Sequence, residues 1–178
     1  MQQPTTQQAL GDVVIADFAR VLAGPYATML LADFGADVVK VERAGCRRRH
    51  PALGSAVVGG RGHLFESVNR NKRSVAWDLR DPHHLEQARE LVARADIVTE
   101  NFLPGAMSRL GLGYEDVRQL NPDVIYCSVT GFGGGSTLPG YDMVIQAADC
   151  SEWPKGLRRR VAPPQINSLR ASDGGTDL

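Results

Sequence analysis

The sequence predicts an α/β protein with a largely parallel sheet flanked by helices. Strand-length apolar runs recur along residues 13–132, helix-length segments separate them, and the two kinds of segment alternate. The chain of 178 residues is long enough for one domain with a buried core. We expect three parts: a polar arm over residues 1–12, the α/β domain over 13–148, and an irregular tail over 149–178.

The first unit of this fold spans residues 13–43. VVIADF at 13–18 is a short apolar run, and DVVKVE at 37–42 is rich in β-branched residues, so both suit buried parallel strands. Gly24 and Pro25 mark the start of a helix between them, and Gly35 stands where a helix C-terminal glycine is usual. A strand, helix and strand therefore open the chain, and Arg43 follows the second strand.

The later elements continue the alternation. Residues 46–62 have no apolar period and predict a loop. Pro82 after Asp81 suits a helix start, and the apolar residues that follow share one helical face. The remaining expected elements are strands at 74–79, from Ile97 and from Val124, the last one buried, and short helical turns at 105–110 and 114–120.

Composition excludes several classes of function. Lys and Arg total 20 and Asp and Glu total 20, so no overall charge favours a nucleic acid or a membrane surface as partner. No apolar stretch is long enough to span a bilayer and the first residues are polar, so we expect a cytoplasmic protein. Three scattered cysteines and four histidines lack the spacing of a disulfide framework or a metal site, so no metal is expected.

The turn FARVLAGP at residues 18–25 is the first candidate site. Free N–H groups at a helix start attract phosphate, although the same turn also suits simple packing. The GxGxxG fingerprint of a dinucleotide site is missing, and Pro25 removes one donor, which disfavours nicotinamide or flavin binding. Glu42 imitates a ribose-binding acid, and Arg43 suits a phosphate or a solvated surface.

A second candidate site follows the strand at Ile97. Asn101 and Phe102 leave that strand at its carboxyl end, where ligands bind in open α/β sheets, and Arg109 comes soon after. An amide, an aromatic ring and an arginine suit an adenine nucleotide. The alternative is a plain connection to a helix with Asn101 as its cap.

Four motifs in order resemble the class III CoA-transferases, a family that includes formyl-CoA transferase, carnitine and bile-acid CoA-transferases and alpha-methylacyl-CoA racemase. They are ADFxRVLAGPYATMLLADFGADVVKVER, SVNRNKRSVAWDL, ADIVTENFLPGAMSRLGLGYEDVRQLNPDVIYCSVTGFG and PGYDMVIQA. The resemblance implies a Rossmann-like CoA-binding domain, a second domain formed by a longer chain, and an interlocked homodimer. Acyl-CoA and a carboxylic acid would be the substrates.

The resemblance also implies roles for individual residues. It places Val21 and Ala23 along the CoA channel, and Arg43 and Arg109 on phosphates. The residues that would approach the nucleotide, the pantetheine or the thioester are Trp77, Arg80, Asn101, Phe102 and Tyr141.

Transferases of this family use an aspartate that attacks the acyl thioester and forms a mixed anhydride. The resemblance places this nucleophile near Ala171, where the chain offers Asp173 in a different sequence setting. Racemases of the same fold carry a histidine where this chain has Tyr141, so Tyr141 favours transfer over racemisation. Racemisation stays as an alternative.

Two segments depart from the family pattern. Where this chain has residues 45–58, members of the family usually read like GDDTRxWGPPF, whereas this chain reads CRRRHPALGSAV. One choice of codons for residues 46–56, read one nucleotide later, gives AGDDTRRWGPP. We therefore hypothesise compensating frameshifts there, and an uncompensated one in the tail that truncates the chain. On that hypothesis the chain is a non-catalytic fragment that binds CoA weakly or pairs with a full-length homologue. A nucleotide-binding enzyme unrelated to CoA is the third hypothesis.

Overall fold

The computed structural model of the chain describes residues 8–44, 57–58, 61–136 and 140. Most of the predicted polar arm, the segment of the hypothesised frameshift and the whole tail from 149 onward lie outside these residues. Tyr141 and Asp173, two of the expected site residues, lie outside them as well.

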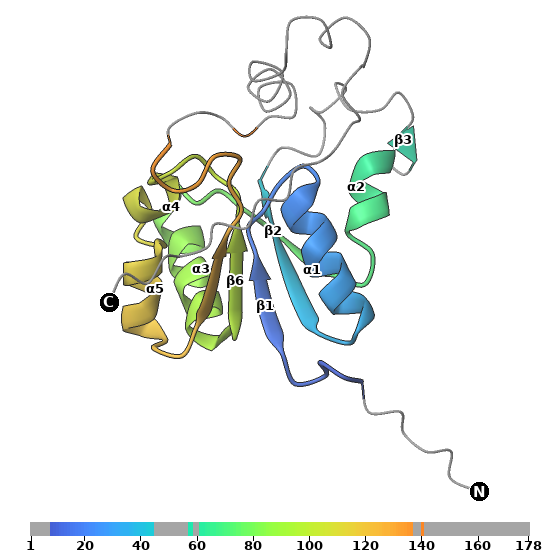
Figure 1. The fold of residues 1–178 in the computed structure, drawn as a ribbon, viewed down its shortest axis with the longest axis horizontal. Coiled ribbons are helices and arrows are strands. Elements are labelled where there is room, and N and C mark those ends of the chain that lie inside the picture. Colours follow the sequence, from blue (N-terminus) through green and yellow to red (C-terminus); the bar gives the residue numbers. More distant parts are fainter. Residues whose placement is uncertain (1–7, 45–56, 59–60, 137–139, 141–178) are drawn as a thin grey trace, which may run out of the picture.

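A parallel sheet of five strands forms the centre of the protein, as the sequence predicts (Figure 1). Its order is β5-β2-β1-β6-β7, and every neighbouring pair is parallel. The strands are β1 (Val14–Asp17), β2 (Asp37–Arg43), β5 (Arg73–Trp77), β6 (Ile97–Glu100) and β7 (Ile125–Ser128). Because the strands are parallel, their carboxyl ends lie along one edge of the sheet.

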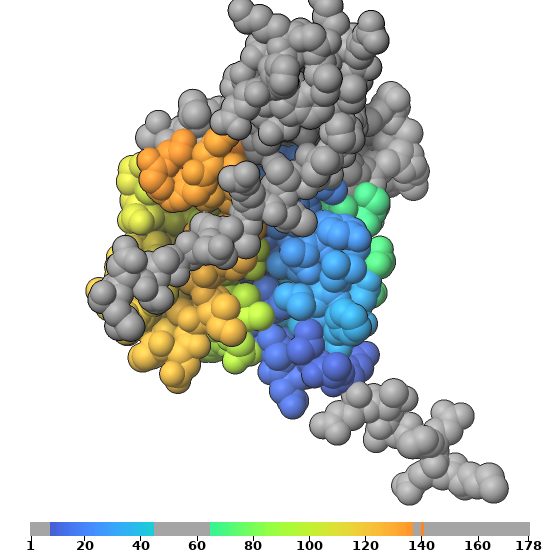
Figure 2. All heavy atoms as spheres, in the orientation of Figure 1, coloured from blue at the N-terminus to red at the C-terminus, as the bar shows by residue number. Residues whose placement is uncertain are grey.

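Helices cover both faces of the sheet. The helix α1 lies on one face, and α3 and α5 lie on the other (Figure 1). In space-filling view α1 forms much of the right half of the visible surface (Figure 2). The helices are α1 (Ala23–Asp33), α2 (His63–Val68), α3 (Pro82–Arg94), α4 (Ala106–Arg109) and α5 (Tyr114–Leu120).

The predicted helix signals are confirmed at α1 and α3. Asp81 caps α3 by accepting a hydrogen bond from the N–H of His83 at 2.9 Å, and Pro82 occupies its first turn. Gly35 has a φ of +106° directly after the end of α1, a backbone conformation that glycine adopts without a steric cost.

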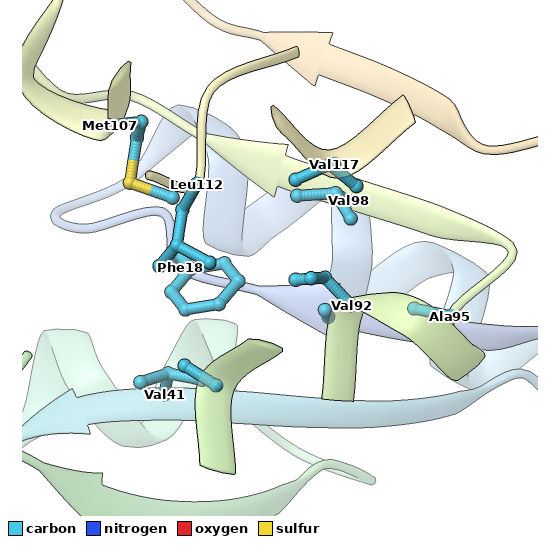
Figure 3. Packing of buried hydrophobic residues seen from close by; sticks show 10 residues of the cluster. Phe18, Val41, Val92, Ala95, Val98, Met107, Leu112 and Val117 are labelled. Carbon is cyan, nitrogen blue, oxygen red and sulfur yellow. The ribbon is translucent and has the colours of Figure 1, made fainter. Parts of the chain in front are cut away.

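The larger hydrophobic core fills the space between the sheet and the helices α3 and α5. Figure 3 shows Phe18 and Val41 from the sheet side packing toward Val92 of α3 and Leu112. A smaller cluster lies under α1 and contains Ile15, Ala32, Ala36 and Val38. Since Phe18 follows β1 directly, the core extends to the carboxyl edge of the sheet.

Two sequence predictions are wrong in detail. The expected loop at 46–62 contains a short antiparallel pair, β3 (Val57–Val58) and β4 (Arg61–Gly62), before α2. The strand from Val124 is not buried, because Ile125 is 62% exposed and Cys127 is also exposed. The physical reason is position: β7 is the last strand in the sheet order, and β6 is its one strand neighbour within the described residues.

No helix in the described part of the chain is both long and apolar enough to cross a membrane.

Candidate functional site

A pocket opens at the carboxyl edge of the sheet, where ligands bind in open α/β folds. It has a volume of about 180 Å³. Its walls come from the ends of four strands, β1, β2, β5 and β6, and from the segments that follow them. The lining residues are Phe18, Arg20, Val41, Glu42, Arg43, Trp77, Asp78, Leu79, Arg80, Phe102 and Leu110.

The charges of the pocket favour an anion. Three arginines, Arg20, Arg43 and Arg80, face two carboxylates, Glu42 and Asp78, which leaves one positive charge in excess. A guanidinium group holds phosphate oxygens in a fixed, two-pronged geometry. The pocket therefore suits a phosphorylated ligand.

Asp78 limits this positive potential. Arg80 Nε lies 3.2 Å from Asp78 Oδ1, and both side chains are exposed. Hydrogen bonds from Arg80, and the more distant charge of Arg43, hold the pKa of Asp78 below its ordinary value. Asp78 therefore stays ionised and competes with any ligand for Arg80.

Aromatic and aliphatic side chains form the rest of the wall. Phe18 and Val41 reach the pocket from the core, and Trp77 and Phe102 stand at the ends of β5 and β6. The Arg20 guanidinium carbon lies 4.4 Å from the centre of the Phe102 ring, within the range of a cation–π contact. Flat apolar surfaces next to cations suit a nucleotide base joined to phosphates.

The connection from β1 to α1 and the first residues of that helix, together residues 18–25 and called here the turn, border the pocket and are held from two sides. Asn101 accepts a hydrogen bond from the Arg20 N–H and donates one to the Arg20 carbonyl, each at 2.7 Å. The Phe18 N–H bonds the Thr99 carbonyl at 2.8 Å. Val21 follows with a φ of +67° and is 56% exposed. A β-branched residue in this conformation is strained, so the surrounding contacts must fix the turn.

Gly24 has a packing role in the same turn. A Cβ at this position would overlap the Cβ of Ala19, which is fully buried. Gly24 and Pro25 are themselves buried and do not line the pocket. The geometry thus favours the packing alternative for this glycine.

Residues 10–173 match the model of a protein family described as CoA-transferase family III. The chain belongs to CoA-transferase family III. This confirms the resemblance that the four motifs indicated.

Curated members of CoA-transferase family III are similar to the chain over most of its length. Succinyl-CoA:glutarate CoA-transferase of Homo sapiens is 41% identical over 172 residues, which are 95% of this chain and 38% of the human protein. Succinyl-CoA:mesaconate CoA-transferase of Haloarcula hispanica is 46% identical over 149 residues, 78% of this chain and 38% of that protein. The chain therefore spans well under half the length of these relatives.

A solved structure of the family has the same fold. The CAIB/BAIF family protein of Brucella suis superposes with a TM-score of 0.72 at 40% identity, covering 79% of this chain and 39% of that one. The Rossmann-like parallel sheet with flanking helices that the sequence predicts is thus confirmed.

Within this member of CoA-transferase family III, the pocket brings together four of the predicted cofactor residues, Arg43, Trp77, Arg80 and Phe102. Asn101 stands next to it and bonds Arg20. Three further predicted residues, Val21, Ala23 and Arg109, lie on the adjoining turn, on α1 and on α4 and are not among the lining residues. Tyr141 and Asp173 are outside the described residues.

Sequence reasoning missed part of the wall. It missed Val41, Asp78, Leu79 and Leu110, named Phe18 and Arg20 only as part of the candidate turn at residues 18–25, and weighed Glu42 only as a ribose-binding acid. Their signal was available for the first strand: Arg20 follows β1 as Phe102 follows β6, and neighbouring parallel strands end at the same edge. The apolar residues carried no such signal, because core and pocket positions have the same composition.

Proposed function

We propose that this chain carries the CoA-binding part of a transferase that moves CoA from an acyl-CoA to a carboxylic acid. The observation that carries the proposal is the pocket of three arginines beside Trp77 and Phe102 at the carboxyl edge of the sheet. Family membership supports it, because the relatives are named for CoA transfer between carboxylic acids. CoA itself combines an adenine base, several phosphates and a thiol-ended arm, which such a wall can accommodate.

The ligand would be held in two parts. Arg43 and Arg80 would pair with phosphates, while the adenine would lie against Trp77 or Phe102. The thioester arm would run along the turn that holds Val21 and toward Ala23, with Arg109 as an additional phosphate contact. The acyl group would then lie near Tyr141.

The chemistry would require a carboxylate nucleophile. Its oxygen attacks the thioester carbonyl, the carbon–sulfur bond breaks, and CoA leaves as a thiolate while an acyl-carboxylate anhydride forms. The thiolate then attacks the enzyme carbonyl of this anhydride, which releases the donor acid and leaves CoA as a thioester on the enzyme carboxyl. The acceptor acid attacks that thioester, which forms a second anhydride and frees the thiolate again. Attack of the thiolate on the acceptor carbonyl gives the acceptor's CoA thioester and restores the enzyme carboxylate. Asp173 is the candidate for the nucleophile, and backbone N–H groups would stabilise the oxyanions.

Binding of acetyl-CoA to the 178-residue chain, measured by isothermal titration calorimetry, tests the cofactor assignment. Arg43→Met should weaken binding about tenfold because it removes a phosphate partner. Arg118→Met is the matched control, since Arg118 lies on α5 against Tyr114 and does not line the pocket. Equal affinity in both variants would contradict the assignment.

Mass spectrometry after incubation with succinyl-CoA tests the chemistry. A covalent acyl or CoA adduct supports transfer, and saturable binding without an adduct supports the alternative of a non-catalytic fragment. Release of α-deuterium from 2-methylacyl-CoA would instead support racemisation.

Sedimentation of the chain tests the interlocked homodimer that family resemblance implies, and fractionation of cells tests the expected place in the cytoplasm.

A further inference from the structure

A buried cluster of charges lies under α1, on the face of the sheet opposite the core of Figure 3. It consists of Asp17 at the end of β1, Lys40 in β2 and Lys72 just before β5. Their side chains are 0%, 6% and 1% exposed. None of the three lines the pocket. A role for them must therefore be exerted through other residues.

Each oxygen of the Asp17 carboxylate accepts two hydrogen bonds. Its Oδ1 accepts from the Ala19 N–H at 2.9 Å and from Lys40 Nζ at 3.2 Å. Its Oδ2 accepts from the Thr28 hydroxyl at 2.7 Å and from Lys72 Nζ at 3.1 Å. Four donors on one buried carboxylate fix its position between the two lysines.

Among the residues that the structure describes, Asp17 is the carboxylate paired with both ammonium groups, so one buried positive charge is left over. Burying a charge is costly unless polar groups surround it, and apolar residues of similar volume would stabilise the fold at least as well. The second lysine is thus poorly explained by stability alone. A more specific role is indicated by what the lysines hold.

The two lysines bind opposite ends of residues 18–25. Lys40 donates to the carbonyl of Ala19, just after β1. Lys72 donates to the carbonyl of Pro25, in the first turn of α1, at 2.7 Å and to Asn69 Oδ1 at 2.9 Å. Val21, with its strained backbone, lies between these anchors. Strain of this kind persists only where surrounding contacts over-determine the conformation.

We propose that Lys72 is a positioning residue, which holds the turn at residues 18–25 in the shape that receives the cofactor and adds a buried positive charge behind it. This inference rests on the proposed function, because it assumes that the cofactor binds beside this turn. Lys72 acts through the backbone of Pro25 and through Asp17, not by touching the ligand. The expected ligand class is a polyanionic acyl-CoA.

The protonation state of Lys72 gives a second way to test its role, by changing the pH. Burial lowers the pKa of Lys72 to about 8, Asp17 opposes this shift, and Lys40 adds to it. Burial also lowers the pKa of Lys40, against the opposing charges of Asp17 and Glu42, while Arg20 lowers it further. A neutral amine has two N–H donors for four acceptors, so raising the pH above 8 removes both a charge and part of the anchoring.

Lys72→Met in the 178-residue chain tests the inference, with Arg73→Met as the matched control. Arg73 is the next residue and carries the same charge, but its side chain is 68% exposed and paired with Asp37. Acetyl-CoA is the probe, since it has no free thiol to titrate near pH 8. We expect Lys72→Met to weaken its binding at least about fivefold at pH 7, a usual size for coupling between sites, and Arg73→Met to leave it nearly unchanged.

Hydrogen exchange read by mass spectrometry gives a readout that does not depend on the ligand. Peptides covering residues 18–28 should lose protection in Lys72→Met and keep it in Arg73→Met, while peptides of α3 serve as the internal reference for folding. If Lys72→Met does not fold, the pH dependence of the unaltered chain tests the role of Lys72 instead. Its affinity for acetyl-CoA should fall at least about threefold between pH 7 and pH 9.5, because the buried charge is lost.

The outcomes separate the two proposals. Equal acetyl-CoA affinity in Lys72→Met and the unaltered chain, a flat pH profile, or full protection of residues 18–28 in the variant overturns the role of Lys72 alone. Absence of acetyl-CoA binding by the unaltered chain overturns the proposed function, and the positioning role with it.

Discussion

Asn101 binds both backbone groups of Arg20, although the two residues are 81 positions apart in the chain. The side-chain amide acts as a backbone partner would, and it joins the segments that follow β1 and β6 beyond the last paired residues, Asp17 and Thr99. Family resemblance assigns Asn101 to the cofactor, and the geometry gives it a second task in shaping the turn after β1.

Asn101→Ala should lower the free energy of unfolding by about 1–2 kcal/mol, because it leaves two backbone groups without their partner. Acetyl-CoA affinity should fall with it, since Arg20 lines the pocket. Urea denaturation and calorimetry measure the two effects. Asn121→Ala is the control: it removes a comparable bond to the Ala95 carbonyl, outside the pocket, and should spare acetyl-CoA binding. Equal loss of affinity in both variants would contradict a specific role.

Val21→Asn should raise the free energy of unfolding by about 0.5–1 kcal/mol. Asparagine tolerates a positive φ far better than a β-branched residue, and Val21 is too exposed to lose much burial. Leu103→Asn serves as the comparison, since Leu103 is an exposed apolar residue without a positive φ and should gain nothing. A destabilised Val21→Asn would show that the valine side chain has a packing role that outweighs the strain.

Gly24→Ala should destabilise the chain by about 1–3 kcal/mol, because its Cβ would overlap the buried Ala19. Ala19→Gly should recover part of this loss when the two changes are combined, as expected for a purely steric conflict. Thermal unfolding followed by circular dichroism measures all three variants. Gly134→Ala, where a Cβ meets no atom within 4 Å, should change little. Additive losses in the double variant would argue against the steric account.

The free energy of unfolding of the unaltered chain, minus that of Lys72→Met, should rise with pH between about 8 and the ordinary lysine pKa of 10.5. In this window the unfolded chain keeps the Lys72 proton while the folded chain has lost it, so the unfolded state binds more protons and stability increases with pH. Urea midpoints at several pH values measure the difference and cancel groups common to both proteins. A difference that falls with pH would contradict the lowered pKa.

Asp78→Asn should tighten acetyl-CoA binding roughly twofold to fivefold at low salt, since it frees Arg80 and removes a negative charge from the pocket. The gain should shrink as salt screens the exposed charges. Calorimetry at two salt concentrations measures both. Asp12→Asn, just before β1 at the amino edge of the sheet, should have no effect. Weaker binding in Asp78→Asn would mean that the carboxylate itself contacts the ligand.

The sequence predicts the sheet well because apolar runs and helix signals are local. β1, α1 and β2 occur where VVIADF, the Gly24 region and DVVKVE indicate, and Asp81 caps α3 as expected. The exposure of β7 was not predictable in this way, because strand order is a property of the whole sheet. An apolar run fits an edge strand as easily as a central one.

The candidate site was predictable where charged or aromatic residues stand at or just after a strand end, as for Arg43 and Phe102. Arg20 lies in the predicted candidate turn, but the place of its side chain in the pocket was not predicted, because that place depends on β6 lying beside β1. The Asp17, Lys40 and Lys72 cluster was equally hidden: the side chains come from three strand regions up to 55 positions apart, and buried lysines look like surface lysines in a sequence.

The strand order determines when the pocket can form during folding as well as its shape. Its wall requires β6 to dock beside β1, yet two other strands of the same sheet lie between them in the chain, so the most distant contact must form before the cavity exists. Nascent chains released before residue 102 would contain Arg20 and Arg43 but would lack Phe102 and Leu110 of the pocket wall. The appearance of ligand binding during refolding therefore reports when β6 pairs with β1.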